Sequence, residues 1–252
     1  MALRHDEGWN SPPDAPFYPA LPAVYRGVKL QMLFFQARPA AVEALLPEPL
    51  EALPDGACVV LGIEVPFCTS YGPFLEAVLQ LKCRFRGKEG YYCSHVFHTG
   101  PAGIAAGREI YGTPKLFSEL SVRYTDRAMV TTAGLGGVEI FKLSTFTPTV
   151  IPGDSAPSLS PSWRLKIIPR ADGPGPALKQ LIDASRAAQD QAIHFCAHGK
   201  GSLTFGSSPL LDLAPLEPVA CGDAYYLETS FSESYAEIVY DYLAKATRTG
   251  TT

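Results

Sequence analysis

Short apolar runs, each ended by proline or glycine, recur along the chain and restrict its fold more than any other feature. The 252 residues include 23 prolines and 22 glycines, which interrupt helices and mark turns between strands. Many short runs separated by such turns are typical of an all-β sandwich or barrel. Six segments are predicted to be strands: residues 28–36, 57–67, 76–86, 91–98, 138–143 and 163–168.

Two segments instead predict helices. Residues 39–46 have Pro39 in the first turn and apolar residues at helical spacing. Residues 177–188 carry three apolar side chains on one helical stripe. The proline-rich residues 1–22 predict an extended arm laid over the body or over a neighbouring subunit, and residues 23–252 predict a single domain.

Composition and charge exclude several classes of function. A formal net charge of −4 leaves no basic field to attract nucleic acid or anionic lipid. Residues 1–16 contain acidic residues and prolines where an export signal needs an apolar run, and no stretch reaches the length of a membrane span. We therefore expect a cytoplasmic protein that has neither nucleic acid nor a membrane as a partner.

Histidine and cysteine spacing does not predict a metal site. His95 and His98 form one candidate pair, and His194 and His198 with Cys196 between them form another, but neither has a third ligand at a telling spacing. The six cysteines contain no C-x-x-C pair, so free, buried thiols are expected rather than disulfides. We predict packed or hydrogen-bonded histidines, no metal and no cofactor.

The most informative segment is residues 107–116, Gly-Arg-Glu-Ile-Tyr-Gly-Thr-Pro-Lys-Leu. A turn dense in glycine and proline between two strand-like runs bends the backbone sharply and can direct one side chain into a cavity. Lys115 stands at the end of this turn. A solvated lysine on a surface turn is the alternative, because lysine is rarely buried.

The order G-R-E, a short spacer and P-K resembles the catalytic segment of acetoacetate decarboxylases. Three further segments resemble family segments in the same order: residues 47–51 (PEPLE), residues 165–169 (LKIIP) with Asp172-Gly173 after them, and residues 237–243 (EIVYDYL). The resemblance covers nearly the whole chain after the arm. It implies an α+β, mainly β fold, a closed or conical antiparallel barrel with few helices, and assembly into homo-oligomers.

The resemblance also implies a mechanism, in which the amine of Lys115 attacks a substrate ketone and the resulting protonated imine withdraws electrons from an adjacent carbon–carbon bond. The amine must be neutral to attack, whereas an ordinary lysine, with a pKa of about 10.4, is neutral in only roughly one molecule in a thousand near pH 7. An apolar pocket or a neighbouring cation lowers such a pKa, and acetoacetate decarboxylase is itself the standard example. Glu76 falls where the family has an active-site carboxylate and is a candidate proton shuttle, the alternative being a solvated residue at a strand start.

Two positions depart from the family pattern. The family has a second lysine after the nucleophile, where this chain has Leu116, and its substrate-facing arginine falls on Val28. Arg26 lies two residues earlier, on the same face of a regular strand, and is a candidate replacement for the cation, the alternative being an exposed arginine at a strand end. Arg108 is a further candidate cation beside the lysine.

Glu64 is the candidate for the second carboxylate of the family. It stands in the apolar run of residues 59–65, where an unpaired carboxylate is costly, so we expect it to be functional or ion-paired. The predicted catalytic residues are thus Lys115 and Glu76. The predicted substrate-binding residues are Glu64, Arg26, Arg108 and Leu116.

Three functions remain open. The first is a carbon–carbon lyase that decarboxylates a small β-keto acid through an imine on Lys115. The second keeps the imine but uses it for aldol chemistry or dehydration of a pyruvate-like or polyketide-derived ketone, which Val28 and Leu116 favour because they remove the expected cations. The third is a non-catalytic, ligand-binding member of the superfamily.

Overall fold

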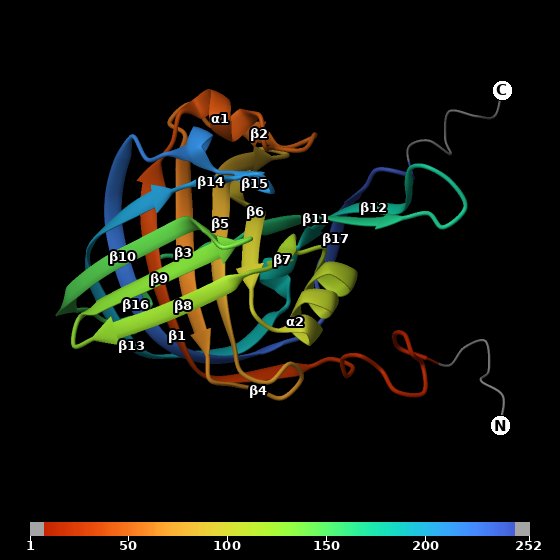
Figure 1. Cartoon of the computed structure of the whole chain (residues 1–252), viewed down its shortest axis with the longest axis horizontal. Coiled ribbons are helices and arrows are strands. Elements are labelled where there is room, and N and C mark those ends of the chain that lie inside the picture. Colours follow the sequence, from red (N-terminus) through yellow and green to blue (C-terminus); the bar gives the residue numbers. More distant parts are fainter. Residues whose placement is uncertain (1–7, 245–252) are drawn as a thin grey trace.

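The structure, a computed structural model, describes residues 8–244, and the ends of the chain, residues 1–7 and 245–252, lie outside this range (Figure 1). Part of the predicted arm therefore lies outside the described residues. No helix within the described range has the length and apolar character that a membrane span needs.

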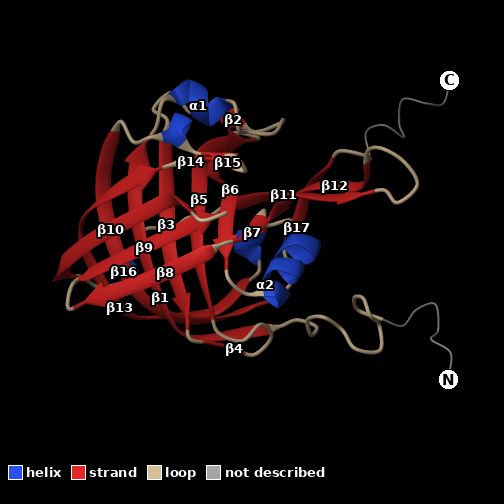
Figure 2. Cartoon of the chain, viewed as in Figure 1, coloured by secondary structure: helices blue, strands red, loops and turns tan. Residues whose placement is uncertain are grey.

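Strands form most of the described chain (Figure 2). Those before residue 118 are β1 (Ala23–Gln36), β2 (Glu51–Ala52), β3 (Ala57–Val65), β4 (Phe67–Cys68), β5 (Phe74–Phe85), β6 (Lys88–His98) and β7 (Lys115–Phe117). Those after it are β8 (Glu119–Thr125), β9 (Ala128–Leu135), β10 (Val138–Val150), β11 (Ser162–Pro169), β12 (Pro176–Asp183), β13 (Ala188–Phe205), β14 (Ser207–Ser208), β15 (Leu211–Asp212), β16 (Ala220–Glu233) and β17 (Glu237–Asp241). The mainly β fold with few helices is confirmed.

The helical segments are short and connect consecutive strands (Figure 2). They are the α-helices α1 (Pro39–Glu43) and α2 (Pro101–Ala106), the π-helical turn η1 (Gly107–Tyr111) and the 3-10 turns η2 (Gly153–Ser155), η3 (Ala184–Arg186) and η4 (Ala214–Leu216). The helix predicted at residues 39–46 corresponds to α1, with proline in its first turn.

One large, mostly antiparallel sheet contains all strands except β14 and β15. Its order is β17-β12-β11-β6-β5-β3-β1-β16-β13-β10-β9-β8, with β2, β4 and β7 attached at the side. The sheet curls until β8 and β9 lie across β3 and β5 (Figure 1). The strand order ends at β17 and β8, which do not pair within the described residues, so closure into a barrel stays a prediction.

The main core lies between the layers that this curling brings together. Leu79 and Phe97 from one layer and Phe141 from the other are at most 1% exposed. Burying each such side chain stabilises the fold by about 1.5–3 kcal/mol. The fully buried Gln31 contacts the hydroxyl of Thr131 across the layers, so its amide is not left unpaired.

All six predicted strands are confirmed, but the helix predicted at residues 177–188 is wrong. The segment forms β12, which pairs with β11 and β17, followed by η3. Its apolar residues fit a helical stripe because Leu181 and Ile182, adjacent in the sequence, are both buried. A register shift against β17 occurs between these two residues, and such an irregularity interrupts the alternation that identifies a strand.

Residues 8–22 precede β1 in bends and turns, and at Tyr18 they lie against the body of the same chain. The Tyr18 side chain is only 4% exposed, and its hydroxyl donates a 2.5 Å hydrogen bond to Glu109 in η1. Burial, followed by this hydrogen bond, raises the pKa of Tyr18. The division between arm and domain, and a role for the arm between subunits, stay predictions.

Candidate active site

The turn that carries Lys115 is shaped by two glycines. Residues Gly107–Tyr111 form a single π-helical turn, a feature frequent at functional sites. A Cβ atom at Gly107 would lie 2.7 Å from Cε of Lys115, so the lysine stem occupies the space that any other residue would fill. Gly112 has a φ of +69°, and a Cβ there would lie 2.3 Å from the Cα of Lys166. The glycines of the G-R-E…G-T-P-K segment thus set the path of the Lys115 side chain.

Strand register brings Lys115, His98 and Glu76 to the same face of the sheet. Lys115 of β7 pairs with Val96 of β6, and His98 is two residues further along β6. His98 in turn pairs with Glu76 of β5. Since directly paired residues, and residues two apart in a strand, share a face, all three side chains point in one direction.

Lys115 and Glu76 form a close pair. The Lys115 Nζ atom lies 3.0 Å from Oε2 of Glu76, and the two side chains are 12% and 13% exposed. Burial raises the pKa of Glu76, but its neighbours, with the charge of Lys115 first among them, more than offset that effect, so the pKa lies below its ordinary value. The carboxylate is therefore ionised near neutral pH and stands where it can accept a proton from the amine.

His98 is completely buried behind this pair. Burial, reinforced by the charge of Lys115, lowers the pKa of His98 to about 4, so the ring is neutral at physiological pH. The N–H of Gly100 donates to its Nδ1 at 2.8 Å, which assigns the proton of the neutral ring to Nε2. Nε2 lies 3.6 Å from Oε2 of Glu76, longer than a hydrogen bond, and is buried without a hydrogen-bond partner among the described residues.

Apolar rings shield the amine. Phe74 stacks on His98 with ring centroids 4.3 Å apart, and the Nζ atom of Lys115 lies 5.6 Å from the centroid of Phe74. Exclusion of water strengthens electrostatic interactions at such a site and penalises an unpaired charge.

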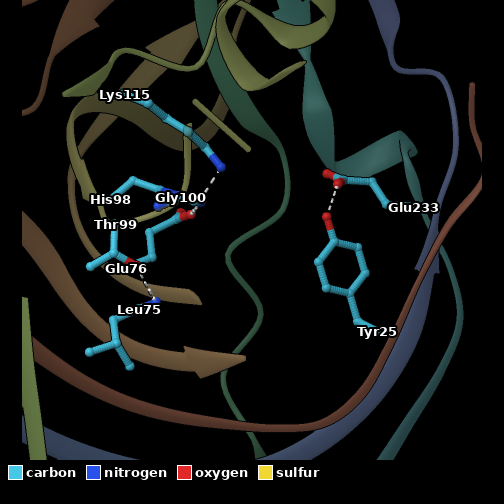
Figure 3. A network of polar contacts seen from close by, with 8 residues as sticks. All are labelled: Tyr25, Leu75, Glu76, His98, Thr99, Gly100, Lys115 and Glu233. Carbon is cyan, nitrogen blue, oxygen red and sulfur yellow. Dashed lines mark hydrogen bonds and ion pairs between the residues drawn. The ribbon is translucent and has the colours of Figure 1, made fainter. Parts of the chain in front are cut away.

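Lys115 and Glu76 face a cavity of about 490 Å³, large enough for a small organic substrate. Tyr25 of β1 and Glu233 of β16 line its opposite wall, where the Tyr25 hydroxyl donates a 2.9 Å hydrogen bond to the Glu233 carboxylate. Figure 3 shows the two pairs on either side of the open space. The cavity thus has an amine–carboxylate pair on one wall and a phenol–carboxylate pair on the other.

Comparison with known proteins identifies the family. Residues 9–243 match the model of the acetoacetate decarboxylase family. The chain belongs to the acetoacetate decarboxylase family. Acetoacetate decarboxylase 2 of Mesorhizobium japonicum is 28% identical over 243 residues, which are 93% of this chain and 90% of that protein. Acetoacetate decarboxylase of Acidiphilium cryptum is 28% identical over 256 residues, covering 96% and 99% of the two chains.

Solved structures share the fold of this acetoacetate decarboxylase family member. The acetoacetate decarboxylase of Legionella pneumophila superposes with a TM-score of 0.84 at 23% identity, covering 96% of this chain and all of the other. The enduracididine biosynthesis enzyme MppR, in complex with the condensation product of pyruvate and imidazole 4-carboxaldehyde, superposes with a TM-score of 0.82 at 17% identity and the same coverage.

Val28, which stands in the place of the family's arginine, lines the cavity, whereas Arg26, the predicted replacement for that cation, does not. The side chain of Arg26 instead donates to the backbone oxygens of Tyr25 and Phe231. A bulge shifts the β1–β16 register between Tyr25 and Val28, and Gly27 within it has a φ of +64°. The regular alternation assumed for Arg26 therefore fails, and Tyr25 occupies the cavity wall instead.

The other predicted substrate-binding residues lie outside the cavity lining. Glu64 is on the opposite face of β3, with its Oε1 3.9 Å from Nζ of Lys29, so it is ion-paired, which was one of its two expected states. Leu116 follows Lys115 in a strand and is 37% exposed. Arg108 donates to the backbone oxygen of Lys115 at 3.2 Å, which supports the backbone there but leaves the guanidinium exposed.

Four residues at this site were not predicted: Tyr25, His98 as a neighbour of Glu76, Arg164 and Glu233. Arg164 lines the cavity from β11, directly before the LKIIP segment. Alternation with the buried Trp163 was the available signal for Arg164, but the sequence does not reveal which strand β11 joins.

Residues 8–244 contain no group of three or more His, Cys, Asp or Glu side chains that could hold a metal ion. The remaining candidate ligands have other partners. His194 lies 3.0 Å from the Ser230 hydroxyl, and His198 lies 3.2 Å from a carboxylate oxygen of Asp223. Cys196 is a free, buried thiol.

Proposed function

We propose that this chain is a carbon–carbon lyase that decarboxylates a small β-keto acid through a Schiff base on Lys115. The observation that carries the proposal is the Lys115 amine at the cavity wall, 3.0 Å from the buried carboxylate of Glu76. Membership of the acetoacetate decarboxylase family supports the same chemistry. The cavity of about 490 Å³ fits an acid of this size and leaves room for a larger one.

The first half of the reaction builds the imine. Glu76 accepts a proton from the Lys115 ammonium, and the neutral amine adds to the substrate's ketone carbon. Glu76 then passes that proton to the oxygen and relays a second proton from the nitrogen, so the oxygen leaves as water and a protonated imine remains. Since both protons of the water come from the Lys115 ammonium by way of one carboxylate, no other group is needed to balance these steps.

The second half breaks the carbon–carbon bond. The electron pair of the bond to the carboxylate moves toward the cationic nitrogen, carbon dioxide leaves, and an enamine forms. A proton taken up from solvent adds to the enamine at carbon, and attack of water on the resulting imine releases the ketone and restores the Lys115 ammonium. The apolar surroundings favour loss of carbon dioxide, because the charged carboxylate is converted into a neutral molecule.

Borohydride trapping tests the proposal. The protein is incubated with acetoacetate or pyruvate, reduced with borohydride, and analysed by intact mass and peptide mapping. We expect a covalent adduct on Lys115 with at least one of these compounds, and release of carbon dioxide from acetoacetate. An enzyme that shows no adduct with any oxo acid would contradict the Schiff base and favour the non-catalytic, ligand-binding alternative.

A second candidate function is supported by the opposite wall of the cavity. Aldol condensation, retro-aldol cleavage and dehydration need a group that protonates or deprotonates an oxygen away from the imine, and the pair of Tyr25 and Glu233 offers a phenol and a carboxylate there. MppR, which shares the fold and has been solved with a condensation product of pyruvate, supports this candidate. An adduct with pyruvate but no carbon dioxide from acetoacetate would favour this candidate.

The proposed location and assembly follow from the sequence and the family rather than from the site. We expect the enzyme in the cytoplasm, as a homo-oligomer, with a small oxo acid or ketone as its ligand. Size-exclusion chromatography with light scattering measures the assembly directly.

A further inference from the structure

Arg164 is the one arginine among the residues that line the cavity within the described chain, and its position follows from the pairing of β11. Trp163 pairs with Tyr92 of β6 and is 2% exposed, buried in the core. Because side chains alternate along a strand, Arg164 points to the other face, where the neighbouring Ser162 also lines the cavity. The packed tryptophan therefore holds the strand that directs Arg164 at the site.

The guanidinium of Arg164 makes no hydrogen bond and no ion pair with any residue in the range 8–244. Its Nε atom is buried without a hydrogen-bond partner. The Cζ atom of Arg164 lies 5.9 Å from the ring centroid of Tyr111. Arginine stays charged in proteins and presents several N–H groups in a plane, so a partly buried, unpaired guanidinium is costly unless an anion joins it.

Arg164 lies within electrostatic range of the reacting pair. Together with the stronger effect of Lys115, its charge contributes to the low pKa of Glu76. Burial raises the pKa of the Cys93 thiol to about 11, although Arg164 and Lys115 both oppose that rise. Two cations thus act on the same two buried groups, and only Lys115 has an acidic partner among the described residues.

We propose that Arg164 binds the carboxylate of the substrate whose ketone carbon reacts with Lys115. This deepens the proposed function and rests on it, since it assigns the substrate class as an oxo acid rather than a neutral ketone. Planar guanidinium and carboxylate groups form paired hydrogen bonds, which fixes the acid relative to the amine. The cation that the sequence lacks at Val28 and Leu116 is supplied by β11.

The test compares an acid with its ester. Wild-type protein and an Arg164→Gln variant are titrated with acetoacetate and with methyl acetoacetate, and with pyruvate and methyl pyruvate, and the borohydride adduct on Lys115 is measured by mass. A change in the reactivity of Lys115 itself affects acid and ester alike, so the ratio of their half-saturating concentrations isolates the carboxylate contact.

We expect the wild type to be half-saturated by the acid at a lower concentration than by the ester. In Arg164→Gln the half-saturating concentration of the acid should rise by roughly 10–100-fold, the usual range for a lost charge-assisted hydrogen bond. The half-saturating concentration of the ester should change by less than about threefold. Arg164→Lys should retain part of the preference, because it keeps a cation. Arg38→Gln, an exposed arginine bound to the backbone oxygen of Pro215, is the matched control and should behave as wild type.

Several outcomes would overturn the assignment. If Arg164→Gln raises the half-saturating concentrations of acid and ester equally, Arg164 has a general structural role. If Arg26→Gln raises that of the acid alone, Arg26 binds the carboxylate instead. The wild-type measurement alone also tests the contact, so the test does not depend on a folded variant. If wild-type protein does not prefer the acid to the ester, Arg164 does not bind the substrate carboxylate. In each of these cases the ester still labels Lys115, so the Schiff base survives, whereas no adduct with any compound would reject both proposals.

Discussion

Two lysine–glutamate pairs lie on opposite faces of the same sheet, and only one of them faces the cavity of about 490 Å³. Lys29 of β1 lies 3.9 Å from Glu64 of β3, with side chains 27% and 25% exposed. Lys115 of β7 lies 3.0 Å from Glu76 of β5, with side chains about half as exposed. The same two residue types therefore produce two different electrostatic sites in one sheet.

A neighbouring hollow does not by itself distinguish the pairs. Lys29 borders a hollow of about 610 Å³, larger than the cavity beside Lys115. The Tyr124 hydroxyl lies 2.5 Å from the Lys29 amine, and this hydrogen bond raises the pKa of Lys29, which keeps it a cation. Lys115 instead meets a buried carboxylate, a neutral histidine and an aromatic ring. The groups in contact with the amine, rather than the size of the neighbouring hollow, therefore distinguish the proposed nucleophile from the other lysine.

The largest expected effect separates the two lysines. Lys115→Met should abolish borohydride labelling by oxo acids, a loss of at least roughly a thousandfold, because the nucleophile is gone. Lys29→Met removes a partly exposed cation and should label as wild type. Intact mass and a thermal melt measure labelling and folding together. Full labelling of Lys115→Met would break the comparison and reject the proposed nucleophile.

The next effect separates the two glutamates. Glu76→Gln keeps the size of the side chain but cannot take up the amine's proton, so turnover should fall by roughly 10²–10³-fold without being lost. Glu64→Gln should change turnover by less than about twofold, since exposed ion pairs contribute little even to stability. Initial rates of carbon dioxide release check both variants, and equal rates would remove Glu76 from the mechanism.

A smaller effect tests the glycine that admits the lysine stem. Gly107→Ala would place its Cβ 2.7 Å from Cε and 2.8 Å from Cδ of Lys115, so the amine must move. A displacement of about 1 Å can cost roughly a hundredfold in rate. Gly173→Ala, where no atom lies within 4 Å of the new Cβ, is the control. A Gly107→Ala enzyme as fast as wild type would mean that the path of the lysine is not limiting.

These comparisons also indicate what the sequence could predict. Apolar runs and turn residues are local signals, and they predicted the strands that carry Glu76 and His98. The G-R-E…P-K segment predicted Lys115 because its glycines and proline form a sharp local turn that sets the path of the lysine side chain. Membership of the family was therefore predictable before the fold was known.

The facing of individual side chains was less predictable, because it depends on how distant strands pair. Arg26 was expected in the cavity on the assumption of a regular strand, but the bulge that replaces it with Tyr25 appears in the pairing of β1 with β16. Glu64 was predicted as the family's second carboxylate by adjusting loop lengths in the comparison with the family. The β1–β3 register places it beside Lys29 instead. Arg164 reaches the site only because β11 joins β6, a pairing that no local signal predicts.

The smallest predicted effect concerns the pH dependence of stability and involves His98, which faces Glu76 and Lys115. Its pKa is lowered from 6.5 to about 4 in the folded chain. Between these two values the histidine is protonated in the unfolded chain but neutral in the folded chain. The free energy of unfolding should therefore fall with decreasing pH, by about 2 kcal/mol between pH 7 and pH 5 from this group. Glu76 contributes in the same direction, but its lowered pKa places its loss at more acidic pH.

Urea unfolding at pH 7 and pH 5 measures this effect when wild type is compared with His98→Asn. Asparagine keeps an acceptor for the N–H of Gly100 but does not titrate, so the variant, although less stable throughout, should lose about 2 kcal/mol less than wild type over this interval. His194→Gln, at an exposed position beside Ser230, is the control and should follow the wild-type pH dependence. Parallel pH profiles for wild type and His98→Asn would show that His98 titrates normally, and that the wall behind Glu76 is wetter than its burial indicates.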